Sequence, residues 1–215
     1  VQRLHGMTMR PVRFLGGSTG ATLYDTEQGP RVGKQGAHPA HIQNEFDMNR
    51  YLNALGVNVP QAEMITHRGR PTMLADFISD SQEVGTRPTQ EDVRQLQRDF
   101  VPHALTANWD VLGMTGDNVL RQPDGSLSYV DVGGAGAFRA MGAPKGDRFT
   151  TNVGELDSLR ERNPVFQGMG EQDIGRSLDA HGGIEPMEQA LQYLRDAQTR
   201  NVMQQRVQDI ARRVA

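Results

Sequence analysis

The chain has 215 residues, a formal net charge of −3 at pH 7 and no cysteine. The near-neutral charge gives no electrostatic case for nucleic acid or an anionic membrane surface, and the lack of thiols excludes disulfides and thiolate metal sites. No apolar run approaches the ~20 residues that a membrane span needs. We therefore expect a globular protein of one two-lobed domain or two small domains, with no nucleic acid and no membrane as partner.

A glycine-rich loop lies near the N-terminus, between strands predicted at residues 12–15 and 21–25. It consists of Gly16, Gly17, Ser18, Thr19 and Gly20, and it can approach polyphosphate closely because glycine lacks a Cβ and leaves backbone N–H groups free to face an anion. A strand follows it rather than a helix, which excludes a dinucleotide fingerprint, and no Gly-Lys-Ser/Thr closes it as in a P-loop. Taken alone, such a loop is more often a plain hairpin turn.

A lysine and a glutamate come next. Lys34 ends a third predicted strand over 31–34, and Glu45 lies beside the apolar stripe of a helix predicted over 39–55. Kinases use such a pair to hold the α- and β-phosphates of ATP, with the glutamate fixing the lysine. Each residue alone has a simpler interpretation: Lys34 as a solvated strand end and Glu45 as a surface helix residue.

The remaining regular elements follow the same order. Strands over 63–66 and 72–77 complete an antiparallel unit of five strands and one helix, and residues 75–79 lead out of it in the position of a kinase hinge. Thr89 is a good N-cap for a helix over 90–107, in which Pro102 predicts a kink or a division into two helices. Three more helices are predicted over 155–162, 171–180 and 186–213.

Metal-binding side chains are concentrated between residues 108 and 133. Asn118 opens a short apolar segment, a turn over 122–125 follows, and Asp131 ends the second arm of this hairpin. The hairpin would bring both side chains to one rim, where oxygen ligands suit Mg²⁺ and leave its other positions to phosphates and water. Kinases also need an upstream Asp that orients the attacking hydroxyl, although Asp-Asn and Asp-Gly pairs alone are usually turn formers.

The parts occur in protein-kinase order, which predicts an α+β fold: a reduced two-lobed protein-kinase-like fold with a five-stranded antiparallel N-lobe carrying one helix and a mostly helical C-lobe. We expect a single kinase domain over 1–215, with the N-lobe at about 1–79 and the C-lobe at about 80–215. ATP and Mg²⁺ are the expected cofactors. The loop over 16–20 would cover the phosphates, Lys34 and Glu45 would grip them, and Asn118 and Asp131 would hold the metal.

The catalytic loop departs from the usual kinase pattern. Trp109 precedes Asp110 where conventional kinases have His-Arg-Asp, and Asn118 lies eight residues after that Asp instead of five. The altered spacing leaves two candidates for the catalytic base, Asp110, which we favour, and Asp117. The missing Arg predicts an enzyme that needs no phosphate on its activation segment.

Several motifs resemble a known family. They are Gly16-Gly-Ser-Thr-Gly-Ala21, Asn44-Glu-Phe46, Ala54-Leu-Gly-Val57, Ala107-Asn-Trp-Asp-Val111, Asp117-Asn118 and Arg139-Ala-Met-Gly-Ala-Pro-Lys-Gly146. These segments resemble the minimal bacterial effector kinases of the HopBF family. The resemblance implies an ATP-dependent Ser/Thr protein kinase, secreted by a type III system into the host cell and acting in the host cytoplasm. It further implies a host protein substrate, the heat-shock chaperone of the ninety-kilodalton class, which phosphorylation would inactivate.

Two alternatives stay open. One is an atypical or small-molecule kinase, or an AMP-transferring enzyme, on the same fold. The other is a pseudokinase that serves as a binding module, although such a module has no physical need for Lys34, Glu45, Asn118 and Asp131 together. His38 and His41 are near neighbours without an evident third ligand, so we expect no zinc site. We expect a monomer, because no run of heptads persists.

Overall fold

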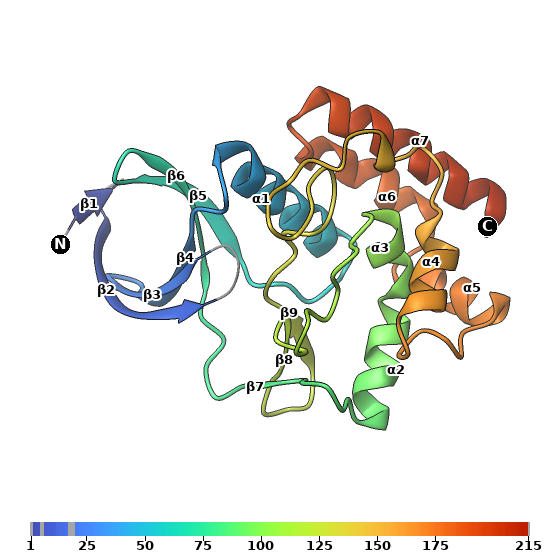
Figure 1. Ribbon diagram of the computed structural model, residues 1–215, viewed down its shortest axis with the longest axis horizontal. Helices are drawn as coiled ribbons and strands as arrows, with labels where there is room; N and C mark the ends of the chain where they lie inside the picture. Colours follow the sequence, from blue (N-terminus) through green and yellow to red (C-terminus); the bar gives the residue numbers. More distant parts are fainter. Residues whose placement is uncertain (1, 5–6, 17–19, 215) are drawn as a thin grey trace.

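The computed structural model describes residues 2–4, 7–16 and 20–214, and these form two lobes (Figure 1). The N-terminal lobe is an antiparallel sheet, with one long helix, α1 (Pro39–Ala54), between the sheet and the second lobe. Within the described residues the sheet has six strands in the order β1-β2-β3-β4-β6-β5. They are β1 (Gln2–Leu4), β2 (Met7–Gly16), β3 (Ala21–Thr26), β4 (Gly29–Lys34), β5 (Ala62–His67) and β6 (Arg70–Asp76).

The five predicted strands are confirmed, and β1 adds a sixth at the edge of the sheet. β2 also begins at Met7, five residues before the predicted start. The reason lies in packing: Met9 is buried with Ile65 and Leu74, so this part of the chain is held in the sheet despite Pro11. Pro11 is tolerated where the register of β2 and β3 shifts, as expected for proline at a bulge.

Helix α1 joins the two lobes. Its N-terminal half packs Ile42 and Phe46 against Met73 of the N-terminal sheet. Its C-terminal half contributes Met48, Tyr51 and Leu52 to the core of the second lobe. The helix therefore carries Glu45 at the boundary between the lobes, where its buried side chain meets Lys34 of the sheet.

The C-terminal lobe is mostly helical, with a small sheet at the boundary between the lobes (Figure 1). Thr89 caps the first helix of this lobe, α2, as predicted, and it forms a capping box with Asp92. The break before the next helix falls at Asp99, so Pro102 sits in the first turn of α3, where its missing N–H is not needed. The elements are α2 (Gln90–Arg98), α3 (Phe100–Leu105), α4 (Glu155–Arg162), α5 (Glu171–Ala180), α6 (Ile184–Gln189), α7 (Ala197–Arg213), the 3₁₀ turns η1 (Gly146–Arg148) and η2 (Ala190–Tyr193), and the strands β7 (Gln82–Glu83), β8 (Val119–Arg121) and β9 (Leu127–Tyr129).

The prediction of one helix over 186–213 is wrong. The chain forms α6 and η2, leaves the helical path at Leu194, and begins α7 at Ala197. Asp196 caps α7 by accepting a hydrogen bond from the N–H of Thr199. Asp47 of α1 accepts hydrogen bonds from the backbone N and the Nε of Arg195, at 3.0 and 2.8 Å. A contact with a distant helix and a local cap thus override the amphipathic pattern.

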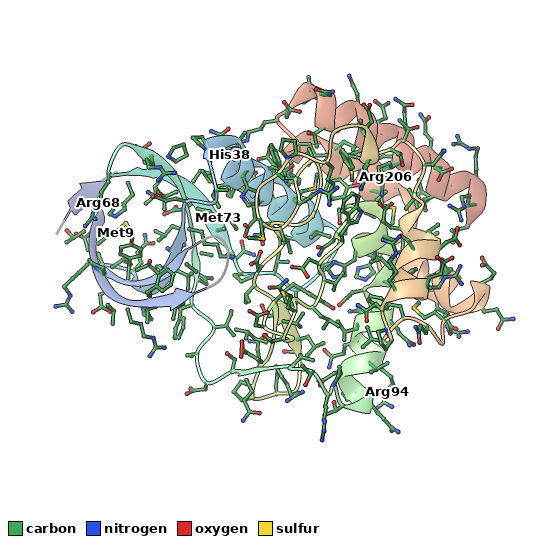
Figure 2. The ribbon with its side chains drawn as sticks, in the orientation of Figure 1. Met9, His38, Arg68, Met73, Arg94 and Arg206 are labelled. Carbon is green, nitrogen blue, oxygen red and sulfur yellow. The ribbon has the colours of Figure 1, made fainter. Side chains whose placement is uncertain are left out.

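A fully buried arginine, Arg206 of α7, holds the helical lobe together (Figure 2). Its guanidinium donates hydrogen bonds to the carbonyl oxygens of Leu105 and Ala104 at 2.8 and 2.9 Å. It also pairs with the Glu155 carboxylate at 2.7 Å. These bonds satisfy carbonyl groups at the C-terminal end of α3, from which the chain enters the loop that carries Asp110.

Among the described residues, no helix combines the length and apolarity that crossing a membrane requires.

Candidate active site

Lys34 and Glu45 form a buried ion pair at the boundary between the lobes. The Lys34 Nζ lies 3.0 Å from the Glu45 Oε2, and the two residues are 7% and 1% exposed. Burial lowers the pKa of Lys34, but the charges of Glu45 and Asp131 outweigh it, so the pKa lies above its ordinary value. The ammonium form is therefore held in place at a site where a phosphate could bind. The predicted contact between these side chains is confirmed.

Lys34 also reaches the segment that carries Asp131. Its Nζ donates a hydrogen bond to the carbonyl oxygen of Val130 at 2.7 Å. Asp131 in turn accepts a hydrogen bond from the backbone N–H of Gly133 at 3.0 Å. A Cβ at Gly133 would lie 2.9 Å from the Glu45 Oε1, so glycine lets this turn approach the glutamate. Lys34, Glu45 and Asp131 thus form one electrostatic cluster.

The hairpin of β8 and β9 brings Asn118 next to this cluster, as predicted. Val119 pairs with Tyr129, and the N–H of Val130 donates to the carbonyl oxygen of Asn118 at 3.0 Å. The Asn118 Nδ2 donates to the backbone and side-chain oxygens of Asp110, at 2.7 and 3.3 Å. Because Nδ2 is used by Asp110, the Oδ1 atom is the one that remains for a metal ion.

The two candidate bases have different surroundings. Asp110 is half-buried, and burial raises the pKa of its carboxyl above the ordinary range. The hydrogen bond from Asn118 opposes this rise in the pKa, and the charges of Asp131 and Asp117 add to it. Asp117 is exposed and packs over Gly113, whose φ of +80° suits a residue without a Cβ. The structure thus brings Asp110 into the cluster and leaves Asp117 at its solvent side.

The loop that carries Asp110 is held by a hydrogen bond to α3. The Asn108 Oδ1 accepts a hydrogen bond from the N–H of Asp110 at 3.4 Å, and its Nδ2 lies 3.1 Å from the Nδ1 of His103. His103 is fully buried, and burial lowers its pKa to about 4. It is therefore neutral, with Nδ1 as acceptor, at physiological pH. On the other side, the Trp109 Nε1 donates to the Glu155 Oε2 at 2.8 Å.

Several residues of this site were not predicted from the sequence. The His41 Nε2 lies 3.2 Å from the carbonyl oxygen of Gly133, and the Asn44 Nδ2 donates to that of Ala135 at 2.8 Å, so α1 holds the segment after Asp131. Lys145, which follows that segment, donates to the carbonyl oxygen of Gly134 at 2.7 Å. The sequence does carry a signal for Lys145: it is one of two lysines in a chain with 21 arginines.

The glycine-rich loop is described only at its ends. Gly17, Ser18 and Thr19 lie outside the described residues. Gly16 and Gly20 have φ values of +87° and +69°, which favour glycine at both ends of the loop that joins β2 and β3. That this loop covers phosphates stays a prediction.

The residues present fit Mg²⁺. The Asn118 amide and the Asp131 carboxylate supply hard oxygen ligands, and the neighbouring carboxylates of Asp110 and Asp117 repel each other without a cation. Within the described residues no group of three His, Asp or Glu side chains forms a metal site. Mg²⁺ in a kinase needs no such group, because one or two side chains suffice when phosphates and water complete its shell.

Comparisons with known proteins identify the fold. No protein-family model and no curated protein matches the sequence. Among solved structures, a proinflammatory kinase of Helicobacter pylori, CtkA, superposes with a TM-score of 0.63 at 12% identity, covering 96% of this chain and 92% of that one. Vaccinia related kinase 3 aligns at 11% identity with a TM-score of 0.38, covering 99% of this chain and 74% of that one. The likeness to CtkA shows that the chain has the α+β two-lobed fold of protein kinases.

Proposed function

We propose that this protein is an ATP-dependent protein kinase. The observation that carries the proposal is the convergence of Lys34, Glu45, Asp110, Asn118 and Asp131, from five separate parts of the chain, on one boundary between two lobes. The fold shared with CtkA supports it. A folded binding module would gain nothing from a buried Lys–Glu pair beside a row of repelling carboxylates, because burying charges is costly.

In the proposed reaction each residue has one task. Lys34, fixed by Glu45, binds the α- and β-phosphates of ATP. Asn118 and Asp131 would hold Mg²⁺, which would neutralise charge on the phosphates. Asp110 accepts the proton of the substrate hydroxyl. The hydroxyl oxygen then forms a bond to the γ-phosphorus, the bond between that phosphorus and the bridging oxygen breaks, and ADP leaves with the bonding electrons. The raised pKa of Asp110 suits a group that must take up a proton.

The identity of the substrate rests on the sequence resemblance. It supports Ser/Thr specificity, a place in the HopBF family and delivery by type III secretion into the host cytoplasm. It also supports the host chaperone of the ninety-kilodalton class as target and inactivation as outcome. These points are proposed on the resemblance alone.

The test is a labelling experiment. The purified chain is incubated with radiolabelled ATP, Mg²⁺ and a eukaryotic lysate, beside an Asp131→Ala control and a sample with the purified chaperone. We expect γ-phosphate label on a host protein with the wild type and none with the control. Label that enters only from the α-phosphate, or a mass increase equal to AMP on the target, would show AMP transfer instead. Tight ATP binding without any transfer would favour the pseudokinase.

A further inference from the structure

The chain uses lysine at two positions only, Lys34 and Lys145, beside 21 arginines. Both lysines are buried, at 7% and 4% exposure. An ammonium is a compact charge with three donors, whereas a guanidinium is a broad planar fork, so the two are not interchangeable in a tight space. The restriction of lysine to two buried positions near Asp131 indicates that each has a specific task. Lys34 binds phosphates in the proposed reaction, whereas Lys145 contacts none of the reacting groups named there.

Lys145 joins three segments of the chain. It lies just after a short closed loop in which Phe138 pairs with Pro144. Its Nζ donates to the carbonyl oxygen of Ala107 at 2.6 Å and to that of Gly134 at 2.7 Å, and it lies 4.4 Å from the centroid of the Trp109 ring. The Nζ also lies 5.9 Å from the centroid of the Phe149 ring, so two charge-assisted hydrogen bonds and two cation–π contacts occupy the ammonium.

The acceptors of Lys145 lie close to both functional carboxylates. Ala107 is three residues before Asp110, and Gly134 is three residues after Asp131. Ala107 has a φ of +51°, a left-handed conformation that is unfavourable for a residue with a Cβ, so contacts from other segments must hold it. A Cβ at Gly134 would lie 3.3 Å from the Asp110 Cβ, so the two segments are in contact. An ammonium that binds both carbonyls therefore sets the distance between Asp110 and Asp131.

We propose that Lys145 is a positioning residue for phosphoryl transfer, an internal cationic link that aligns Asp110 with Asp131 and takes the place of a phosphate on the segment after Asp131. The proposal rests on the proposed kinase function. In kinases that require such a phosphate, a new Arg–phosphate pair orders the activation segment. Here Trp109 precedes Asp110, and its ring is contacted by Lys145 and, at 5.3 Å, by Arg139.

The charges around Lys145 are consistent with a link that is costly to build. Burial lowers the pKa of Lys145 to about 7, the Glu155 carboxylate raises the pKa, and the guanidinium groups of Arg206 and Arg139 lower it. Removing the ammonium would leave two carbonyl oxygens without their donor. A buried polar group that loses its hydrogen-bond partner lowers the stability of the folded protein. The segments that carry Ala107 and Gly134 would therefore separate or take up water.

The first experiment compares Lys145→Met with Arg148→Met. Methionine keeps most of the apolar stem and removes the ammonium, while Arg148 is an exposed cation three residues later that serves as the matched control. We expect Lys145→Met to lower kcat by about a hundredfold, because a misplacement of about 1 Å can have this effect. The Kd for a fluorescent ATP analogue should change less than about twofold, since Lys34 is untouched. Arg148→Met should keep wild-type values of both.

The second experiment restores the ammonium. The chain has no cysteine, so a Lys145→Cys variant can be alkylated at one position with 2-bromoethylamine in denaturant and then refolded, which rebuilds a lysine-like side chain. Alkylation should recover at least about a tenth of wild-type kcat. Trp109 is the only tryptophan, so its emission reports directly on the link. The emission should differ from wild type in Lys145→Met and return after alkylation.

The proposal would be overturned by a wild-type kcat in Lys145→Met, by equal losses of kcat and ATP affinity, or by loss of wild-type activity after phosphatase treatment. Failure of the kinase function itself is distinguishable. In that case the wild type transfers no phosphate, while the Trp109 emission still shows whether Lys145 holds the loop. An alkylated Lys145→Cys variant that folds but recovers no activity would also contradict the role proposed for the ammonium.

Discussion

Asp110 and Asp117 illustrate how local surroundings select one of two similar side chains. Asp110 receives a hydrogen bond from Asn118, and the charge of Asp131 raises its pKa, whereas Asp117 is exposed. We predict that Asp110→Asn lowers kcat by about 10²–10⁴-fold, the usual contribution of a general base. Asp117→Asn should change it less than about threefold. Single-turnover phosphate transfer measures both, with ATP-analogue binding as the control; the reverse order of effects would make Asp117 the base.

His103, which supports the loop that carries Asp110, makes the stability of the folded protein depend on pH. Burial depresses its pKa to about 4, below the ordinary 6.5. The unfolded chain therefore binds a proton between these values that the folded protein does not, and stability falls as pH falls through this range. The loss should reach about 2 kcal/mol at pH 5 relative to pH 7.5.

Urea unfolding of the wild type and of His103→Gln at both pH values measures this effect. Glutamine does not titrate and can still accept a hydrogen bond from Asn108. The wild type should lose more stability than the variant on acidification. An equal loss in both would assign the pH dependence to other groups.

At the scale of elements, α7 holds α3 and α4 together through Arg206. This buried guanidinium bonds the carbonyl oxygens of Ala104 and Leu105 and the carboxylate of Glu155. We predict that Arg206→Met lowers the free energy of unfolding by about 3–5 kcal/mol, because it leaves buried acceptors and a buried carboxylate unpaired.

Arg212 of the same helix provides the control, since its side chain is 65% exposed and pairs with Asp209 at 3.4 Å. Arg212→Met should cost less than about 1 kcal/mol, as exposed ion pairs usually do. Urea denaturation followed by circular dichroism compares the two variants. Similar losses in both would mean that the buried network contributes little.

At the scale of the whole molecule, the two lobes are joined by α1 and by Lys34. α1 packs on the sheet with Ile42 and on the helical core with Leu52, and Lys34 bonds Val130 across the boundary. The segment with Asp131 is thus held by Lys34 on one side and by Lys145 on the other. Ligand binding at this boundary should stabilise both lobes together.

This arrangement predicts that Mg²⁺ and ATP together raise the melting temperature. At a concentration about 100 times Kd the gain is about 2.7 kcal/mol, which corresponds to roughly 5–10 °C for a chain of this size. Asp131→Ala should lose most of the part that depends on Mg²⁺, and EDTA should have the same effect on the wild type. Scanning calorimetry measures the shift in melting temperature. A shift that EDTA does not reduce would mean that the nucleotide binds without the metal.

The order of local signals in the sequence was enough to predict the two-lobed fold, most strands and the side chains that meet at the boundary between the lobes. That these side chains bind ATP and Mg²⁺ stays a prediction. Lys34, Glu45, Asn118 and Asp131 were predicted together because each follows or occupies an element with a clear pattern, and glycines or turns mark the ends. Hydrophobic periodicity and capping also predicted α1, α4 and α5 closely. They predicted the start of α2 at Gln90, but the helix expected over 90–107 is divided at Asp99. These features depend on residues near one another in the chain, which is why they could be read from the sequence.

Long-range contacts decided the rest. Asp47 holds Arg195 across 148 positions and breaks the predicted terminal helix, and Lys145 reaches Ala107 across 38 positions. Tertiary structure also separated Asp110 from Asp117, because burial and neighbouring charges exist only after folding. Local sequence patterns carry propensity and periodicity, but desolvation and contacts between distant segments arise from the folded chain.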